Sequence, residues 1–144
     1  MDTSFHYLLL AAQGMFQRRI LARLAGSGLT AGQPKVLNYL GLHNGSVQKS
    51  IALGCQIDPA TLTGLLGRME EKGLVERRAE GGDRRALHVY LTDFGWEKQR
   101  EVLRVLEACD REMLSGLDEA EGAALLRGLR HVCEHLAENR EALQ

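Results

Sequence analysis

The fold is decided by residues 57–92, which read IDPATLTGLLGRMEEKGLVERRAEGGDRRALHVYLT. Asp58 followed by Pro59 starts a helix, because aspartate accepts hydrogen bonds from the free N–H groups of the first turn and proline fits its first position. Apolar residues then recur at three- and four-residue steps until Gly73, which is a left-handed stop. From there the apolar residues alternate, which predicts two strands joined by a glycine-rich tip. The stretch therefore predicts a capped helix followed by a β-hairpin.

Three helices are expected before this stretch. Residues 4–25 carry apolar side chains at helical spacing, with Ser4 as the cap, and their apolar face is too wide for a lone surface helix. A capping box, TAGQ at 30–33, opens a second helix. A short third helix is expected over residues 46–54, which places two helices and a tight turn directly before the hairpin.

Two more helices follow the hairpin. Thr92 caps one that runs to about residue 115, and a second capping box, at 118–121, opens the last. Two strands cannot form an independent sheet, so the hairpin must pack against the helices before it. The order of elements predicts a mainly α fold with a small two- to three-stranded β wing, which is the layout of a winged helix-turn-helix.

Composition excludes several classes of protein. With 144 residues, 44% of them hydrophobic, the chain suits one domain with a real core. Its longest apolar run, residues 7–12, is far too short to span a membrane, and the N-terminus lacks the features of a signal peptide. We therefore expect a cytoplasmic protein with no membrane partner. Three widely spaced cysteines without a CxxC pair fit reduced thiols.

The distribution of charge permits a nucleic-acid partner, although the net charge of −1 alone argues against one. Residues 1–57 hold five basic side chains against one acidic, and residues 58–92 hold six of each. Residues 93–144 hold seven basic side chains against twelve acidic. Such asymmetry lets one end of the molecule attract phosphates while the other repels them.

Nearly the whole chain resembles the multiple-antibiotic-resistance regulator (MarR) family. The matching segments are LTAGQ at 29–33, IDPATLT at 57–63, MEEKGLVER at 69–77, DRRA at 83–86 and LTDFG at 91–95. The resemblance implies a homodimer whose two winged heads straddle a pseudo-palindrome in double-stranded DNA. It also implies that a small ligand, or oxidation in some members, loosens DNA binding.

The resemblance divides the chain by role. Residues 29–92 would form the winged helix-turn-helix DNA-binding region. Residues 1–28 and 93–144 would form a helical dimerisation region, so that the whole is one intertwined domain. The implied function is a sequence-specific transcription regulator that acts as a ligand-responsive repressor.

The helix within residues 57–92 is expected to lie in the major groove and to read base edges with its first residues. Thr61 and Thr63 are the candidate readers. Relatives commonly carry an arginine after the second threonine and a polar residue three further on, whereas this chain has Gly64 and Gly67. The departure is compatible with a different base sequence, weaker binding, greater reliance on DNA shape or closer backbone approach. Arg68 remains as a contact further along the helix.

The hairpin tip carries the sharpest group of charged residues. By resemblance, Arg85 enters the minor groove, where a narrow groove strengthens the negative potential, and Asp83 braces it. Arg84 and Arg77 complete the DNA contacts expected from the wing. The alternative is a solvated charged turn, which is ordinary at hairpin tips.

The start of the short helix is expected to contact phosphates. Ser46, Gln48 and Lys49 can do so through their side chains and the helix N-terminus. We expect these contacts to position the protein more than to specify the sequence.

A small aromatic or anionic effector is expected in the crevice that the family has between its dimer helices and its winged head. The residues that could line it are Phe16, Arg19, Tyr39, His43 and Trp96. Each of them fits a packing or rim position equally well.

No metal site and no cofactor are expected. His131 and His135 have the spacing of zinc ligands, but a third ligand would have to come from a neighbouring glutamate, another helix or a second subunit. Cys109 and Cys133 lie on apolar helical faces, which predicts burial in the dimer core. Cys55 lies near the turn between the two DNA-binding helices, and we expect no peroxide response from it.

No motif in the sequence predicts an enzyme, since a phosphate loop, a nucleophile elbow and an HExxH pair are all absent. The alternative to a DNA-binding regulator is a winged-helix protein that uses the fold for protein contact. The two glycines of the recognition helix and the neutral segment 58–92 favour that alternative, and the intact wing disfavours it.

Overall fold

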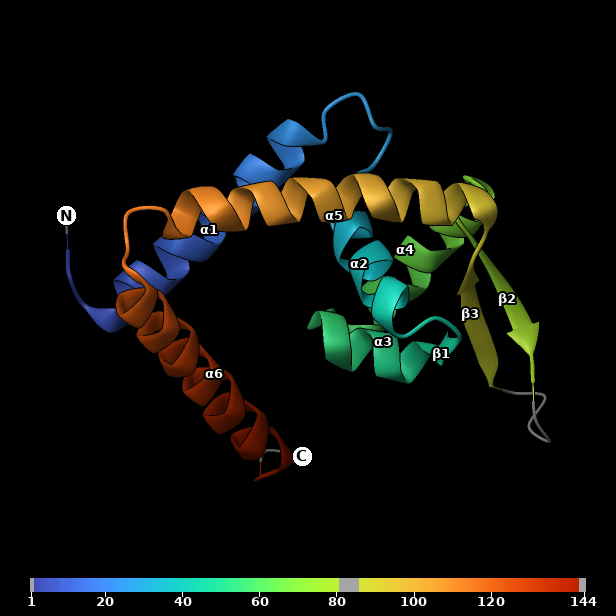
Figure 1. Cartoon of the computed structure of the whole chain (residues 1–144). Coiled ribbons are helices and arrows are strands. Elements are labelled where there is room, and N and C mark those ends of the chain that lie inside the picture. Colours follow the sequence, from blue (N-terminus) through green and yellow to red (C-terminus); the bar gives the residue numbers. More distant parts are fainter. Residues whose placement is uncertain (1, 81–85, 143–144) are drawn as a thin grey trace. The chain divides into compact units, whose positions relative to one another are not determined.

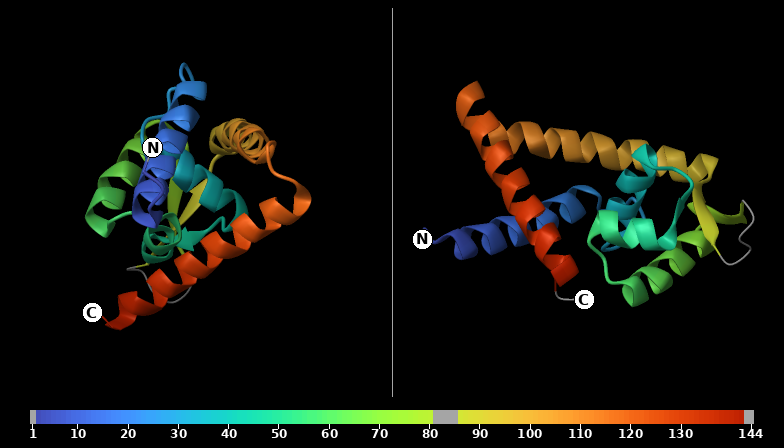
Figure 2. Two further views of the ribbon diagram at one scale, coloured as in Figure 1. Left: turned by 90° about the vertical axis from the view of Figure 1, so that its left-hand side faces the viewer. Right: turned by 90° about the horizontal axis from the view of Figure 1, so that it is seen from below.

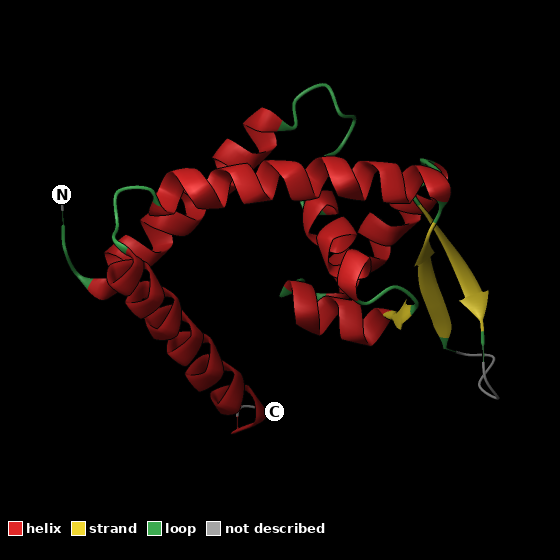
Figure 3. Ribbon diagram, in the orientation of Figure 1, coloured by secondary structure: helices red, strands yellow, loops and turns green. Residues whose placement is uncertain are grey.

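The computed structural model describes residues 2–80 and 86–142, in which the chain forms six helices and three short strands (Figures 1 and 3). The helices are α1 (Phe5–Arg23), α2 (Gln33–Leu42), α3 (Gln48–Cys55), α4 (Pro59–Glu71), α5 (Asp93–Leu114) and α6 (Glu119–Ala142). The strands are β1 (Ser46–Val47), β2 (Val75–Ala79) and β3 (Leu87–Leu91). The fold class predicted from the sequence, mainly α with a small β wing, is confirmed.

The chain divides into two compact units, residues 1–107 and 108–144, and the boundary falls within α5. The division predicted from the sequence, into a DNA-binding region and a dimerisation region, concerns function and not compactness. It stays a prediction. None of the described helices combines the length and the apolar character needed to cross a membrane.

The first unit has a core to which α2, α3 and α4 each contribute one apolar face. Leu37 and Leu40 of α2, Ile51 of α3, and Leu66 and Met69 of α4 are completely buried. Figure 2 shows these three helices gathered beside the strands. Because each helix repeats its apolar residues at three- and four-residue steps, its opposite face is left to solvent. The core therefore fixes α4 with one side exposed.

A third strand completes the wing and corrects one predicted boundary. The sheet has the order β1-β3-β2, both pairings are antiparallel, and Ser46 lies opposite Val89. Ser46 is thus in a strand, and the short helix begins only at Gln48. The left-handed Gly45 (φ 85°) turns the chain alongside β3, and its N–H donates to the Val89 carbonyl at 2.8 Å.

The predicted starts of α4, α5 and α6 are confirmed by their hydrogen bonds. The Asp58 carboxylate accepts from the backbone N–H groups two and three residues further on, at 3.1 and 3.2 Å. The Thr92 hydroxyl accepts from the N–H of Gly95 at 2.9 Å. Before α6, Asp118 and Glu121 each accept from the other's N–H, which completes the predicted capping box.

The other two predicted caps are wrong in part. Ser4 occupies the cap position of α1, but its hydroxyl forms no capping bond. In the predicted box before α2, the Gln33 side chain accepts from the N–H of Thr30 at 3.0 Å, while the helix itself starts only after the left-handed Gly32. The Gln33 oxygen also accepts from Nζ of Lys72 at 3.2 Å, so this buried side chain links α2 to the end of α4 rather than serving only as a cap.

Candidate nucleic-acid interface

Helix α4 presents one face to solvent and packs the other into the core. The buried face consists of Leu62, Leu65, Leu66 and Met69. Four positions that the sequence connects with DNA reading are exposed: Thr61, Thr63, Gly64 and Arg68. Residues three and four apart are neighbours on a helix surface, so Thr61, Gly64 and Arg68 form one stripe, and Thr63 lies beside it. This exposed stripe is accessible to a macromolecule.

Thr63 is held by two hydrogen bonds within the protein. Its hydroxyl donates to the carbonyl of Pro59 at 3.0 Å and accepts from Nε2 of Gln48 at 2.6 Å. Gln48 is the first residue of α3, so a side-chain bond joins the two helices of the helix-turn-helix. Sequence reasoning assigned Gln48 to phosphates and Thr63 to bases, and it gave no sign that the two touch.

The two glycines leave the surface beside Thr63 without side chains. A Cβ atom at Gly64 would lie 3.4 Å from Nη1 of Arg68, and one at Gly67 would meet nothing within 4 Å. The Arg68 guanidinium therefore lies back over Gly64, one turn nearer to the start of α4. Within residues 2–80 and 86–142, no ion pair or hydrogen bond engages this guanidinium.

The residues predicted to contact phosphates meet where β1, α3 and the wing join. The Ser46 hydroxyl donates to the carbonyl of His43 at 2.6 Å, and Lys49 is exposed. A hollow of about 310 Å³ opens there, and its lining residues are Val47, Gln48, Lys49, Arg77, Ala86, Leu87 and Val89. The structure thus gathers Gln48, Lys49 and Arg77 around one concave surface.

Both arginines of β2 are paired with glutamates. Nε of Arg77 lies 3.2 Å from a carboxylate oxygen of Glu70 in α4. Arg78 is bound by Glu76, and its guanidinium carbon lies 4.4 Å from the centre of the Tyr90 ring. The hydrogen bond that Arg78 donates to the Glu76 carboxylate raises the pKa of Arg78. The first pair ties Arg77 to α4, and the contacts of Arg78 hold its side chain against the wing.

The predicted contacts at the wing tip, Asp83, Arg84 and Arg85, lie outside the described residues, and their roles stay predictions. The strands that lead to the tip are joined up to the pair of Ala79 with Leu87. Beyond that pair, the Tyr90 hydroxyl donates to the Glu80 carboxylate at 2.5 Å, a bond that raises the pKa of Tyr90.

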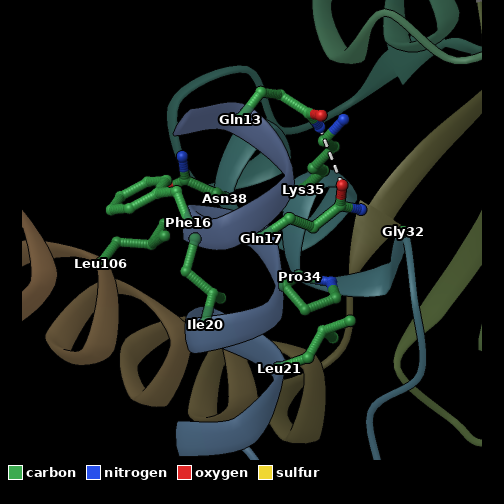
Figure 4. Close-up of a pocket in the computed structure, with 10 residues that line it drawn as sticks. All are labelled: Gln13, Phe16, Gln17, Ile20, Leu21, Gly32, Pro34, Lys35, Asn38 and Leu106. Carbon is green, nitrogen blue, oxygen red and sulfur yellow. Dashed lines mark hydrogen bonds between the residues drawn. The ribbon is translucent and has the colours of Figure 1, made fainter. Parts of the chain in front are cut away.

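A second hollow lies in the first unit, between residues of α1, α2 and α5 (Figure 4). It measures about 290 Å³, and its lining residues are Gln13, Phe16, Gln17, Ile20, Leu21, Gly32, Pro34, Lys35, Asn38 and Leu106. The surface is mainly apolar, with Lys35 supplying a positive charge. Gln13 and Gln17 are joined at its edge by a hydrogen bond of 2.8 Å.

Of the residues predicted to line an effector site, the structure places only Phe16 among the described lining residues of this hollow. The rings of Tyr39 and His43 contact each other instead in a tilted arrangement, with ring centres 4.6 Å apart, and Trp96 packs against the core. Arg19 is exposed on α1. The expected lining consisted of aromatic and basic side chains and so left out the two glutamines, whose four-residue spacing on α1 was the available indication.

Cys55 is poorly suited to react with oxidants. Its thiol is buried and donates to the Lys35 carbonyl with an Sγ–O distance of 3.6 Å. Burial raises the pKa of the Cys55 thiol to about 11, against a smaller lowering by the Lys35 charge. The thiolate is the reactive form of cysteine, so little of it is present at neutral pH.

The two remaining cysteines differ in burial. Cys109 is buried and Cys133 is exposed in the single chain, whereas both were predicted to lie in a dimer core. The rings of His131 and His135 have centres 6.5 Å apart. The part of the chain that the structure describes contains no group of three side chains able to hold a metal ion.

The three helices α2–α4, the three-stranded wing and the exposed stripe of α4 define a winged helix-turn-helix protein. The model of the MarR family matches residues 27–86. The chain is 33% identical over 115 residues to the transcriptional repressor MdtR of Bacillus subtilis (strain 168), a match that covers 78% of this chain and 74% of that protein. The chain therefore belongs to the MarR family, and it is a DNA-binding transcription regulator.

Solved structures agree with this assignment. The transcriptional repressor CouR, bound to a 23-mer DNA duplex, is 26% identical with a TM-score of 0.81, over 90% of this chain and 92% of that one. The PcaV regulator of Streptomyces coelicolor, in complex with its natural ligand, shares the fold at 22% identity and a TM-score of 0.79, over 93% of this chain and 96% of that one. A role in protein contact alone is not favoured.

Proposed function

We propose that this regulator is a ligand-responsive repressor that binds a pseudo-palindromic DNA duplex as a homodimer. The observation that carries the proposal is the exposed stripe of α4 beside the hollow that Lys49 and Arg77 line. α4 would enter the major groove, and Ser46 and Lys49 would meet the adjoining backbone. The wing would reach the minor groove through its tip, 83–85.

Apolar side chains on α6 support the homodimer. Leu125, Leu126, Leu129 and Leu136 are between 41% and 61% exposed in the single chain. Exposed apolar patches of this kind mark surfaces that bind another protein. A second copy of the chain would cover them and would bring two recognition helices to one duplex, as a pseudo-palindrome requires.

The hollow between α1, α2 and α5 supports the effector. Its apolar lining with Lys35 fits a small aromatic anion, and its volume of about 290 Å³ lies near the lower end for ligand pockets. Benzoate is a suitable probe, and calorimetric titration of wild type against Lys35→Met tests whether the charge contributes. We expect no enzymatic activity, and a cytoplasmic location follows from the proposed role on DNA.

The experiment that tests DNA binding is a titration of the protein against its own upstream DNA and against unrelated DNA at several salt concentrations. We expect tight binding to the first alone, with an affinity that falls steeply with salt because phosphate contacts release counterions. Arg85→Ala should weaken that binding strongly and leave the dimer intact. Equal, weak binding to both duplexes would contradict the proposal.

A further inference from the structure

We infer that Gln48 and Arg68 are the side chains that hydrogen-bond to bases at the face of α4, and that Thr63 acts by holding Gln48 in place. The inference rests on the proposed DNA binding through α4 and assigns its specificity. It reverses two expectations from the sequence, since Gln48 was assigned to phosphates and Thr63 to bases.

Thr63 has no hydrogen left to offer a base. A hydroxyl carries one proton, and that of Thr63 is donated to the carbonyl of Pro59 at 3.0 Å. One of its lone pairs is occupied by Nε2 of Gln48 at 2.6 Å. To donate to a base, the hydroxyl would have to break the first of these bonds. What Thr63 still presents to the groove is its methyl group and one lone pair.

Gln48 keeps the groups that read a base. Its amide uses one N–H on Thr63, so the second N–H and the Oε1 oxygen stay available. A donor and an acceptor side by side match the N7 and N6 edge of adenine in the major groove. The bond to Thr63 fixes the amide before DNA arrives, which reduces the entropy lost on binding.

The Arg68 side chain lies against the surface of α4 at Gly64. Its Nη1 atom lies 3.4 Å from the place of a Cβ atom on Gly64, and Gly67 leaves open space on the same stripe. Side chains on a helix lean towards its N-terminus, which is the end that reaches bases. The guanidinium fork is thereby brought towards the groove floor, where it matches the O6 and N7 atoms of guanine.

The charge environment singles out Arg68 among its neighbours. Arg77 and Arg78 are paired with Glu70 and Glu76, respectively, whereas no described acidic side chain pairs with Arg68. An arginine without a protein partner loses no ion pair when it meets DNA. Gly64 and Gly67 carry no side chains that could cover the Arg68 guanidinium on this part of α4.

The test starts from a library of random-sequence duplexes, from which the wild-type protein selects its site. The selected duplex is then titrated with wild type and variants, with single base changes and with 7-deazaguanine, which lacks N7, at each guanine in turn. Arg68→Ala should bind the selected duplex roughly 10- to 100-fold more weakly. It should also lose sensitivity to 7-deazaguanine at one position of each half-site, while its affinity for unrelated duplex changes little.

Two variants separate base reading from charge. Arg68→Lys keeps the positive charge but not the two-pronged fork, so it should retain binding to unrelated duplex and lose the guanine preference. Arg127→Ala, which removes an exposed arginine of α6, is the matched control and should leave the preference unchanged. A weakening by Arg68→Ala that is equal for all sequences would identify a phosphate contact and overturn the assignment of Arg68.

A double-mutant cycle tests the role of Thr63. Gln48→Ala and Thr63→Val should reduce discrimination at the same adenine, and the double variant should be no worse than Gln48→Ala alone. Thr63→Ser keeps the hydroxyl and should restore that discrimination. If the two single changes act at different bases, or if their effects add, Thr63 reads DNA directly and this part of the inference is wrong.

The outcomes also separate the inference from the function on which it rests. If the wild-type protein enriches no sequence, the proposed specific DNA binding fails and the assignment fails with it. If it enriches a sequence that Arg68→Ala and Gln48→Ala recognise with unchanged preference, the function stands and the inference alone is overturned.

Discussion

Many apolar residues of the first unit are buried, whereas many of those on helix α6 are exposed. In the first unit, Leu40 and Leu66 are completely buried by side chains of the same chain. In α6, Leu126 and Leu136 are 53% and 61% exposed. A buried leucine contributes to folding, whereas an exposed leucine on a regular helix contributes once another surface covers it. The comparison separates the part of the chain that supplies stability from the part that we propose supplies assembly.

The largest effect is expected from a cavity in the first unit. Leu66→Ala removes a completely buried side chain of α4 and should lower the free energy of unfolding by roughly 2–5 kcal/mol. Urea unfolding followed by circular dichroism measures the change. The matched substitution Leu126→Ala in α6 should cost far less at low protein concentration, because half of that side chain is already in water. Equal losses from the two variants would contradict the comparison.

A pH effect of intermediate size should also come from the first unit. The pKa of Cys55 is raised from 9.0 to about 11 by burial, so the folded state binds this proton more tightly than the unfolded state. The resulting stability is complete below pH 9 and is lost as the pH rises towards 11, by on the order of 2 kcal/mol. Urea unfolding at pH 8 and pH 11 measures the loss.

Two cysteine variants test whether the Cys55 thiol causes this pH effect. Cys55→Ala should remove the part of the pH dependence that the buried thiol causes, whereas Cys133→Ala should keep it, because Cys133 is exposed. If the Cys55→Ala variant keeps the pH dependence of the wild-type protein, another group is responsible for it. Cys55→Ser should leave any response to peroxide unchanged.

Local patterns in the sequence predicted most helices and strands. Features that depend on contacts between residues far apart in the chain could not be predicted in this way. Asp58 and Thr92 cap their helices through atoms two and three residues away, which is information the sequence holds locally. Ser46 was predicted to be helical but lies in a strand. Its pairing with Val89 joins residues far apart in the sequence, so no local pattern indicates it. Likewise, the bond between Gln48 and Thr63 depends on how α3 and α4 pack, so residue type and position alone did not indicate it.

A smaller effect is expected at the link between α4 and the start of α2. Nζ of Lys72 donates to the carbonyl of Gly28 at 2.8 Å and to the Gln33 oxygen at 3.2 Å. Lys72→Met keeps the aliphatic stem and removes both bonds, which should cost about 1–2 kcal/mol of unfolding free energy. Lys49→Met is the matched control, because Lys49 is exposed on α3 and is expected to matter for DNA and not for folding. Unchanged stability in Lys72→Met would show that these bonds merely replace bonds to water.

The smallest effect on the stability of the first unit should come from the change that most disrupts assembly. Leu129→Glu places a charge in the exposed leucine stripe of α6, where Leu129 is 41% exposed. Burying a carboxylate among the leucines of an apolar interface is costly, so we expect dimers to dissociate while the unfolding free energy of the first unit changes by less than about 1 kcal/mol. Sedimentation equilibrium measures the assembly, and urea unfolding measures the stability.

Arg127→Glu is the matched control, since Arg127 is exposed on the same helix and helical spacing places it away from the leucine stripe. This variant should stay dimeric although its charge changes by more than that of Leu129→Glu. A monomer also loses the second recognition helix, so Leu129→Glu should bind a selected duplex far more weakly than Arg127→Glu does. If Leu129→Glu remains a dimer, the leucines of α6 are not the interface, and the division between a stabilising region and an assembling region has to be drawn elsewhere in the chain.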